Sequence, residues 1–130
     1  MIAAPEGLVE IALIEPDAGD AARIRDLVLA GSLPSRVADA MAEDQPDLGR
    51  AEIILIGLQG LGAAEKALLA RLHAEFPRTP LVVLAGADAS AWVDEAVSLG
   101  AFLVLLKSQL TTAKLSSTLR YCACYLQNRG

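Results

Sequence analysis

The sequence predicts an α/β fold, a doubly wound five-stranded parallel sheet with helices on both of its faces. Short aliphatic runs alternate five times with segments of helical periodicity. Several of the runs are apolar at every position, so both of their faces have to be covered by other elements. Of the 130 residues, 54% are hydrophobic but only 4% are aromatic, a composition that suits aliphatic strands packed under helices.

The first strand and helix are predicted near the N-terminus. The run 8–15 is apolar and rich in β-branched residues, as buried strands are. Asp17 or Asp20 can cap the helix that follows, and Gly31 ends it. A weaker strand is expected around Val37.

The connection to the third strand is short. The segment 41–50 is polar and is interrupted by Pro46. About fifteen residues separate Val37 from Glu52, close to the ~10–12 that a crossover between parallel strands needs. We therefore expect the second helix to be short or missing.

The strongest strand signal is the run 51–58. A helix at 62–76 follows and ends before Pro77, because a proline disfavours helical geometry in the residue that precedes it. Ser90 is the expected N-cap of a later helix. The remaining elements alternate in the same way, with a strand at 80–87, a helix at 90–100, a strand at 101–106 and a helix at 111–126.

Composition excludes several classes of function. The formal charge of −5 and the absence of a Lys/Arg cluster argue against nucleic-acid binding. No apolar run approaches the ~20 residues of a membrane span, and the N-terminus lacks the pattern of a secretory signal. Cys122 and Cys124 project from opposite sides of a helix and should stay reduced, as expected of a cytoplasmic protein. We find no linker and expect one domain over 1–130, which could be a module of a longer signalling protein.

The functional site of an open parallel sheet lies at the carboxyl ends of its strands. The residues at these ends occur in the segments "LIEPD", "LIGL", "VVLA" and "FLVLLK". In order and spacing, these segments resemble the receiver domain of bacterial two-component response regulators over nearly the whole chain. "LGAFLVLLKSQL" is especially similar to that family. The resemblance implies a flavodoxin-like sheet with strand order 2-1-3-4-5.

The departures from the family pattern concern its phosphorylation pocket. Gly57 occupies the position at which the family has its phospho-accepting Asp. Pro16 occupies the position at which the family has an acidic residue that binds Mg²⁺. Ala85 replaces a hydroxyl residue, and Val104 replaces the switch aromatic. Three residues keep their chemical type, namely Glu15, Asp17 and Lys107. Phosphoryl transfer needs an acceptor and charge neutralisation, so the resemblance implies a pseudo-receiver without catalytic residues, metal or cofactor.

The leading hypothesis is therefore a non-enzymatic signalling module that acts through protein–protein contact. The resemblance implies a sensor kinase, an output domain or a second copy as the partner. Trp92, Val104, Tyr121 and Tyr125 are the candidate interface residues, since aromatic side chains are enriched at interface hot spots. Plain packing explains each of them equally well.

Two alternatives remain. In the first, the glycine-rich loop 57–62 or a surface patch with Arg36 or Arg120 senses a nucleotide or another anion. The loop reads G-x-x-G-x-G, which matches neither the dinucleotide fingerprint nor the P-loop. The second alternative, a small flavodoxin-like enzyme, is the weakest, because no nucleophile–base pair is present.

Single residues in the predicted site have ordinary structural explanations. An unpaired buried cation is costly, so we expect Lys107 to form an ion pair with Glu15 or Asp17. His73 is the only histidine and is expected to be a solvated helix residue. The two cysteines are expected to pack in the core.

Overall fold

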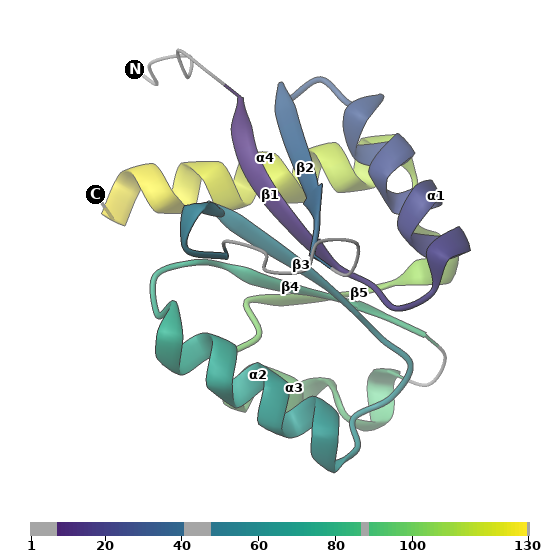
Figure 1. Cartoon of the computed structure of the whole chain (residues 1–130), viewed down its shortest axis with the longest axis vertical. Helices are drawn as coiled ribbons and strands as arrows, with labels where there is room; N and C mark the ends of the chain where they lie inside the picture. Colours follow the sequence, from purple (N-terminus) through teal and green to yellow (C-terminus); the bar gives the residue numbers. More distant parts are fainter. Residues whose placement is uncertain (1–7, 41–47, 87–88, 130) are drawn as a thin grey trace.

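A computed structural model describes residues 8–40, 48–86 and 89–129. It contains one sheet of five parallel strands in the order β2-β1-β3-β4-β5 (Figure 1). The predicted fold class and strand order are therefore confirmed. The strands are β1 (Val9–Ile14), β2 (Ser35–Asp39), β3 (Ile53–Leu58), β4 (Leu81–Ala85) and β5 (Leu103–Leu106). The helices are α1 (Ala18–Leu29), α2 (Ala63–Glu75), α3 (Val93–Ser98) and α4 (Thr112–Arg129).

Helices cover both faces of the sheet, α1 and α4 on one face and α2 and α3 on the other (Figure 1). Each face has its own apolar cluster, because successive side chains of a strand point to opposite faces. β3 and β4 are buried at every position, whereas the edge strand β5 is only partly buried. Continuous aliphatic runs thus lie in the centre of the sheet, as their composition predicts.

The register of the sheet brings the ends of β1 and β3 together. Ile14 is level with Ile56 across the two parallel strands. The next residues along the chain are Glu15 and Gly57, so these two residues lie side by side at the carboxyl edge. Lys107 follows Leu106, the last residue of β5, at the same edge.

The link between β2 and β3 contains no α-helix among the residues that the structure describes. A three-residue 3-10 helix (Leu48–Arg50) precedes β3, and Ala51 closes it by donating to the carbonyl of Leu48 at 3.1 Å. Residues 41–47, with Pro46, lie outside the described residues. The prediction of a short or missing second helix concerns mainly these residues and stays a prediction.

The predicted start of the helix at 90–100 is wrong. Ala89–Ala91 form a 3-10 helix, and Trp92 is the N-cap of α3, which runs only over Val93–Ser98. The N–H of Trp92 donates to the carbonyl of Ala89 at 2.9 Å, so the tight turn takes the place of a serine cap. Asp17, by contrast, caps α1 by accepting from the N–H of Asp20 at 2.9 Å.

No helix in the described part of the chain combines the length and the apolar character that crossing a membrane requires.

Candidate functional site

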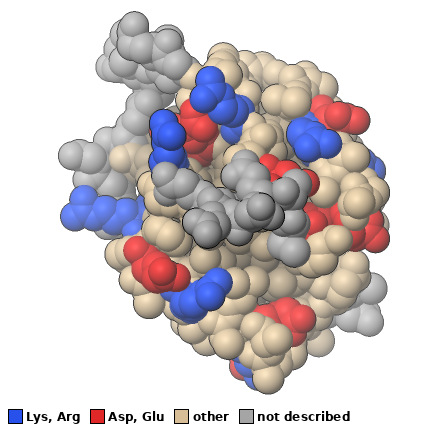
Figure 2. Space-filling view, viewed as in Figure 1, with Lys and Arg blue, Asp and Glu red and all other residues tan. Residues whose placement is uncertain are grey.

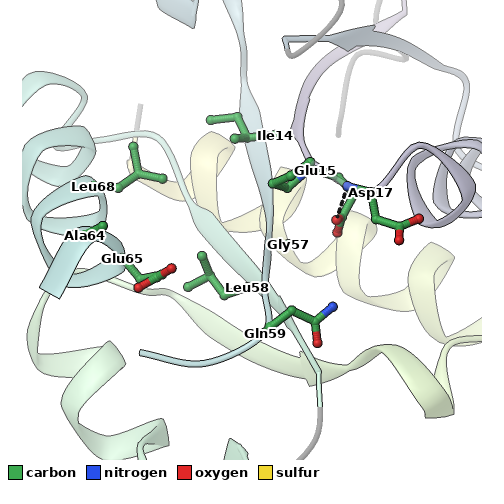
Figure 3. Close-up of a pocket in the computed structure, with 10 residues that line it drawn as sticks. Ile14, Glu15, Asp17, Gly57, Leu58, Gln59, Ala64, Glu65 and Leu68 are labelled. Atoms are coloured by element: carbon green, nitrogen blue, oxygen red, sulfur yellow. Dashed lines mark hydrogen bonds between the residues drawn. The ribbon is translucent and has the colours of Figure 1, made fainter. Parts of the chain in front are cut away.

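The side chain of Glu15 lies directly over Gly57. A Cβ atom placed on Gly57 would lie 2.5 Å from Cδ of Glu15 and would overlap its Oε1. Glu15 is almost fully buried, and its Oε2 accepts a hydrogen bond from the N–H of Asp17 at 3.0 Å (Figure 3). The glycine therefore makes room for a carboxylate that arrives from the neighbouring strand.

Lys107 neutralises this carboxylate. Its Nζ lies 2.7 Å from Oε1 of Glu15 and 3.0 Å from Oδ2 of Asp20. The contact with Asp20 is an aligned hydrogen bond, whereas Oε1 of Glu15 is held by charge without such alignment. The predicted ion pair with Glu15 is confirmed and the alternative with Asp17 is wrong, because Asp20 lies next to the ammonium and the Asp17 carboxylate caps α1.

The environment of Lys107 keeps it charged. Burial by itself lowers the pKa of this ammonium, but its interactions with the carboxylates of Glu15 and Asp20 outweigh burial and raise the pKa above its ordinary value. Arg23 ties the same residue to α1, since its Nη2 donates to the carbonyl of Lys107 at 2.8 Å. The cation at the end of β5 is therefore held by β1 and α1 together.

A cavity of about 480 Å³ opens beside the buried carboxylate (Figure 3). Its acidic lining residues are Glu15 and Asp17 on one side and Glu65 of α2 on the other. None of its described lining residues is basic. The described residues contain no cluster of three or more Asp, Glu, His or Cys that could hold a metal ion. The described lining of the cavity is therefore acidic in its charged residues.

The sequence-predicted site residues are only partly brought together. The cavity is lined by four of them, Glu15, Pro16, Asp17 and Gly57. Lys107 is not a lining residue of the cavity, but its ammonium contacts the carboxylate of Glu15. Ala85 is fully buried and packs in the apolar cluster under α2 and α3. Its methyl side chain carries no polar group.

Sequence reasoning did not identify Asp20, Arg23 or Gln59 as site residues. Asp20 and Arg23 are three residues apart on α1, so they share a helix face, and that spacing was the available signal. The side-chain amide of Gln59 lies against Gly86, where a Cβ would overlap its Oε1 and lie 3.2 Å from its Cδ. No local pattern predicts this contact, because it joins the ends of two strands.

The predicted interface residues differ in exposure. Trp92 and Val104 are partly buried and pack against the cluster under α2 and α3. Tyr121 is 59% exposed, and its ring stacks on Phe102 with a centroid distance of 5.7 Å. Tyr125 lies closer to the same ring, at 4.7 Å.

No protein-family model matches the sequence, and a comparison with curated proteins finds no match. Several solved structures are similar. A CheY-like response regulator receiver domain from Methanospirillum hungatei superposes with a TM-score of 0.73 at 13% identity, covering 95% of this chain and 100% of that chain. The signal receiver domain of an HD domain-containing protein from Pseudomonas fluorescens gives 0.74 at 18% identity, covering 98% and 96%.

This chain has the receiver-domain fold. Two further structures with this likeness carry names that refer to pilus assembly. One, from Burkholderia pseudomallei, has a TM-score of 0.76 at 22% identity and covers 92% of both chains. The other, named CpaE and from Burkholderia thailandensis, has a TM-score of 0.73 at 25% identity and covers 90% of this chain and 99% of that chain. On this receiver fold, the carboxyl edge of the sheet carries the Glu15–Lys107 pair.

Proposed function

We propose that this chain is a phosphorylation-incompetent receiver-like module that works through protein–protein contact. The observation that carries the proposal is the position of Glu15, whose carboxylate fills the space over Gly57 and pairs with Lys107. An incoming phosphoryl group would find no acceptor at Gly57 and would face carboxylates instead of a free cation. The receiver fold is a signalling scaffold in the similar structures, which supports a role in two-component-type signalling.

The proposal includes the kind of partner. A sensor kinase, an output domain or a second copy remains the expected class. Two of the similar structures are described as pilus-assembly proteins, which supports a place within a multi-protein assembly. A module that cannot be switched by phosphate fits such a place as a constant docking element.

The test is incubation with a small phosphodonor, acetyl phosphate, and Mg²⁺, followed by intact-mass spectrometry. We expect no phosphoryl adduct, while an Asp-containing CheY-like receiver treated in parallel acquires one. A base-labile, acid-stable adduct on this chain would refute the proposal. Mapping that adduct to a peptide would identify the residue that accepts phosphate.

Anion sensing by the loop 57–62 receives less support. Glu65 lies near the start of α2, where a Cβ on Gly62 would be 2.8 Å from its Oε1, so the N-terminus of this helix already has a carboxylate. Arg36 pairs with Glu10 at 3.4 Å, and Arg120 donates to Oγ of Ser32 at 2.8 Å. Thermal-shift screening with nucleotides, including cyclic dinucleotides, separates the two hypotheses, because a ligand at 100 times Kd stabilises by about 2.7 kcal/mol.

A further inference from the structure

A groove of about 240 Å³ lies at the amino ends of β4 and β5, at the opposite end of the sheet from Gly57. The ends of α2 and α3 and the loop 77–80 form one side of it. Phe102 and Tyr125 form an aromatic wall, with ring centroids 4.7 Å apart. The groove is independent of the carboxyl-end cavity in position and in lining.

The charge of the groove is opposite to that of the cavity around Glu15. Its described lining residues include Arg78 and His73 but no Asp or Glu. Arg78 is exposed and makes no ion pair with any residue that the structure describes. In a chain with a formal charge of −5, the described lining of this concave surface contains basic side chains and no acidic ones.

The basic groups sit on a well-anchored surface. Gly100 has φ 121°, and a Cβ there would lie 2.5 Å from both Cβ and Cγ of His73, so the histidine packs closely on the glycine. The loop that carries Arg78 is bounded by Pro77 and Pro80 and is closed by a hydrogen bond from the N–H of Thr79 to the carbonyl of Phe76 at 3.1 Å. A surface ordered before binding loses less conformational entropy on association.

We propose that this groove binds a short acidic segment of a partner protein. A carboxylate of the segment pairs with Arg78 and His73, and a neighbouring apolar side chain packs on Phe102 and Tyr125. Guanidinium–carboxylate pairing is charge-assisted and directional, and the exposed edge of an aromatic cluster supplies contact area beside it. The proposal specifies the partner chemistry of the proposed function and rests on it for the premise that the chain works through protein contact.

The size of the groove favours a peptide over a small molecule. Pockets for small molecules typically enclose about 300–1,000 Å³, and this groove is smaller than that range. A short segment that crosses the surface needs to place only a few of its side chains in such a groove. A second copy of the chain is the other conceivable occupant, and the experiment below distinguishes it.

The test is titration of the isotope-labelled protein with a synthetic peptide of alternating Asp and Leu residues, followed by amide proton–nitrogen correlation spectra. We expect saturable shifts at the amides of Arg78, Thr79, Gly100 and Phe102. A peptide with Lys in place of Asp should give no saturable shifts. In the Arg78→Glu variant, the affinity for the acidic peptide should fall about tenfold or more, because attraction becomes repulsion.

The matched control is Arg71→Glu, which makes the same charge change at a residue of α2 that does not line the groove. The affinity of this variant for the acidic peptide should stay within about twofold of that of the parent protein. Equal binding of the Lys peptide, shifts centred on Gly57, an Arg78→Glu variant of unchanged affinity, or no shifts at all would overturn the proposal. Self-association detected by sedimentation, with concentration-dependent shifts at the groove in the absence of peptide, would assign the groove to a second copy and also overturn it. None of these outcomes bears on phosphorylation, so this proposal and the proposed function can fail separately.

Discussion

The carboxylate of Glu15 occupies the space in which any side chain at Gly57 would have to begin. Cδ of Glu15 lies 2.5 Å from the position of a Cβ on Gly57. The two positions are consequently coupled, because a larger residue at 57 requires the carboxylate to leave Lys107. Of the two carboxylates that contact Lys107, Glu15 follows the end of β1 and Asp20 lies on α1, whereas the end of β3 contributes a glycine.

Introducing an acidic residue by Gly57→Asp should not create phosphate acceptance. The new side chain collides with Glu15 and adds a second buried carboxylate. We therefore expect the free energy of unfolding to fall by about 1–3 kcal/mol or more. Urea unfolding measures the loss, and acetyl phosphate with mass spectrometry measures acceptance. Gly60→Ala is the matched control, since nothing lies within 4 Å of its Cβ, and it should change stability by under about 0.5 kcal/mol. A Gly57→Asp protein as stable as the parent would contradict the coupling.

Removing the buried cation by Lys107→Met should be strongly destabilising. Glu15 would remain buried without a counter-charge, and such a loss typically costs about 3–5 kcal/mol. Chemical denaturation of the variant gives the value. The control is Lys66→Met, which removes the exposed ion pair between Nζ of Lys66 and Oε2 of Glu95, 2.8 Å apart. This change should lower the free energy of unfolding by under about 1 kcal/mol.

A double variant separates the ion pair from simple packing. In Lys107→Met combined with Glu15→Gln, no uncompensated charge is buried, so part of the lost stability should return. If the double variant is no more stable than Lys107→Met alone, the energetic role of the pair is refuted.

Alkaline pH should weaken the fold through Lys107. The folded-state pKa of this group is raised above 10.5, so its stabilisation is fully present below about pH 10.5 and is lost as the pH rises through the folded-state pKa. We therefore expect the free energy of unfolding to decrease from about pH 10.5 upward. Because other groups also titrate there, the measurement is the difference between the parent and Lys107→Met across about pH 9–12. Parallel stability curves for the two proteins would argue against this assignment.

The two cysteines should differ sharply in reactivity. Cys122 is buried, and burial raises the pKa of its thiol to about 12, whereas Cys124 is exposed. Because the thiolate is the reactive form, Ellman's reagent should modify one thiol quickly in the native protein and the second only after denaturation. Cys124→Ser should abolish the fast reaction. Rapid modification of both thiols in the native state would place Cys122 outside the core.

The two cysteines also show how far helical periodicity reaches. Cys122 lies in line with Leu115 and Leu119 and is buried with them, as the pattern predicts. The expectation that Cys124 packs in the core is wrong, because two further residues turn the helix by about 200° and place the thiol in solvent. Neither cysteine is bridged, in agreement with the same rotation.

Local sequence patterns were sufficient to predict the sheet and to place a glycine at the end of its third strand. Short aliphatic runs without polar positions are typical of buried strands covered on both faces, and a glycine at the end of β3 carries no side-chain oxygen. The edge at which Glu15, Gly57 and Lys107 meet also follows, since parallel strands finish on the same side.

The choice of partners at that edge required the folded chain. Lys107 contacts Asp20 instead of Asp17 because the first turn of α1 uses Asp17 as its cap and presents Asp20 to the ammonium. The closeness of Glu15 to Gly57 likewise depends on the register between β1 and β3, a relation between residues more than forty positions apart. Periodicity describes neighbours along one element, whereas distances between elements are set by how the whole sheet and its helices pack.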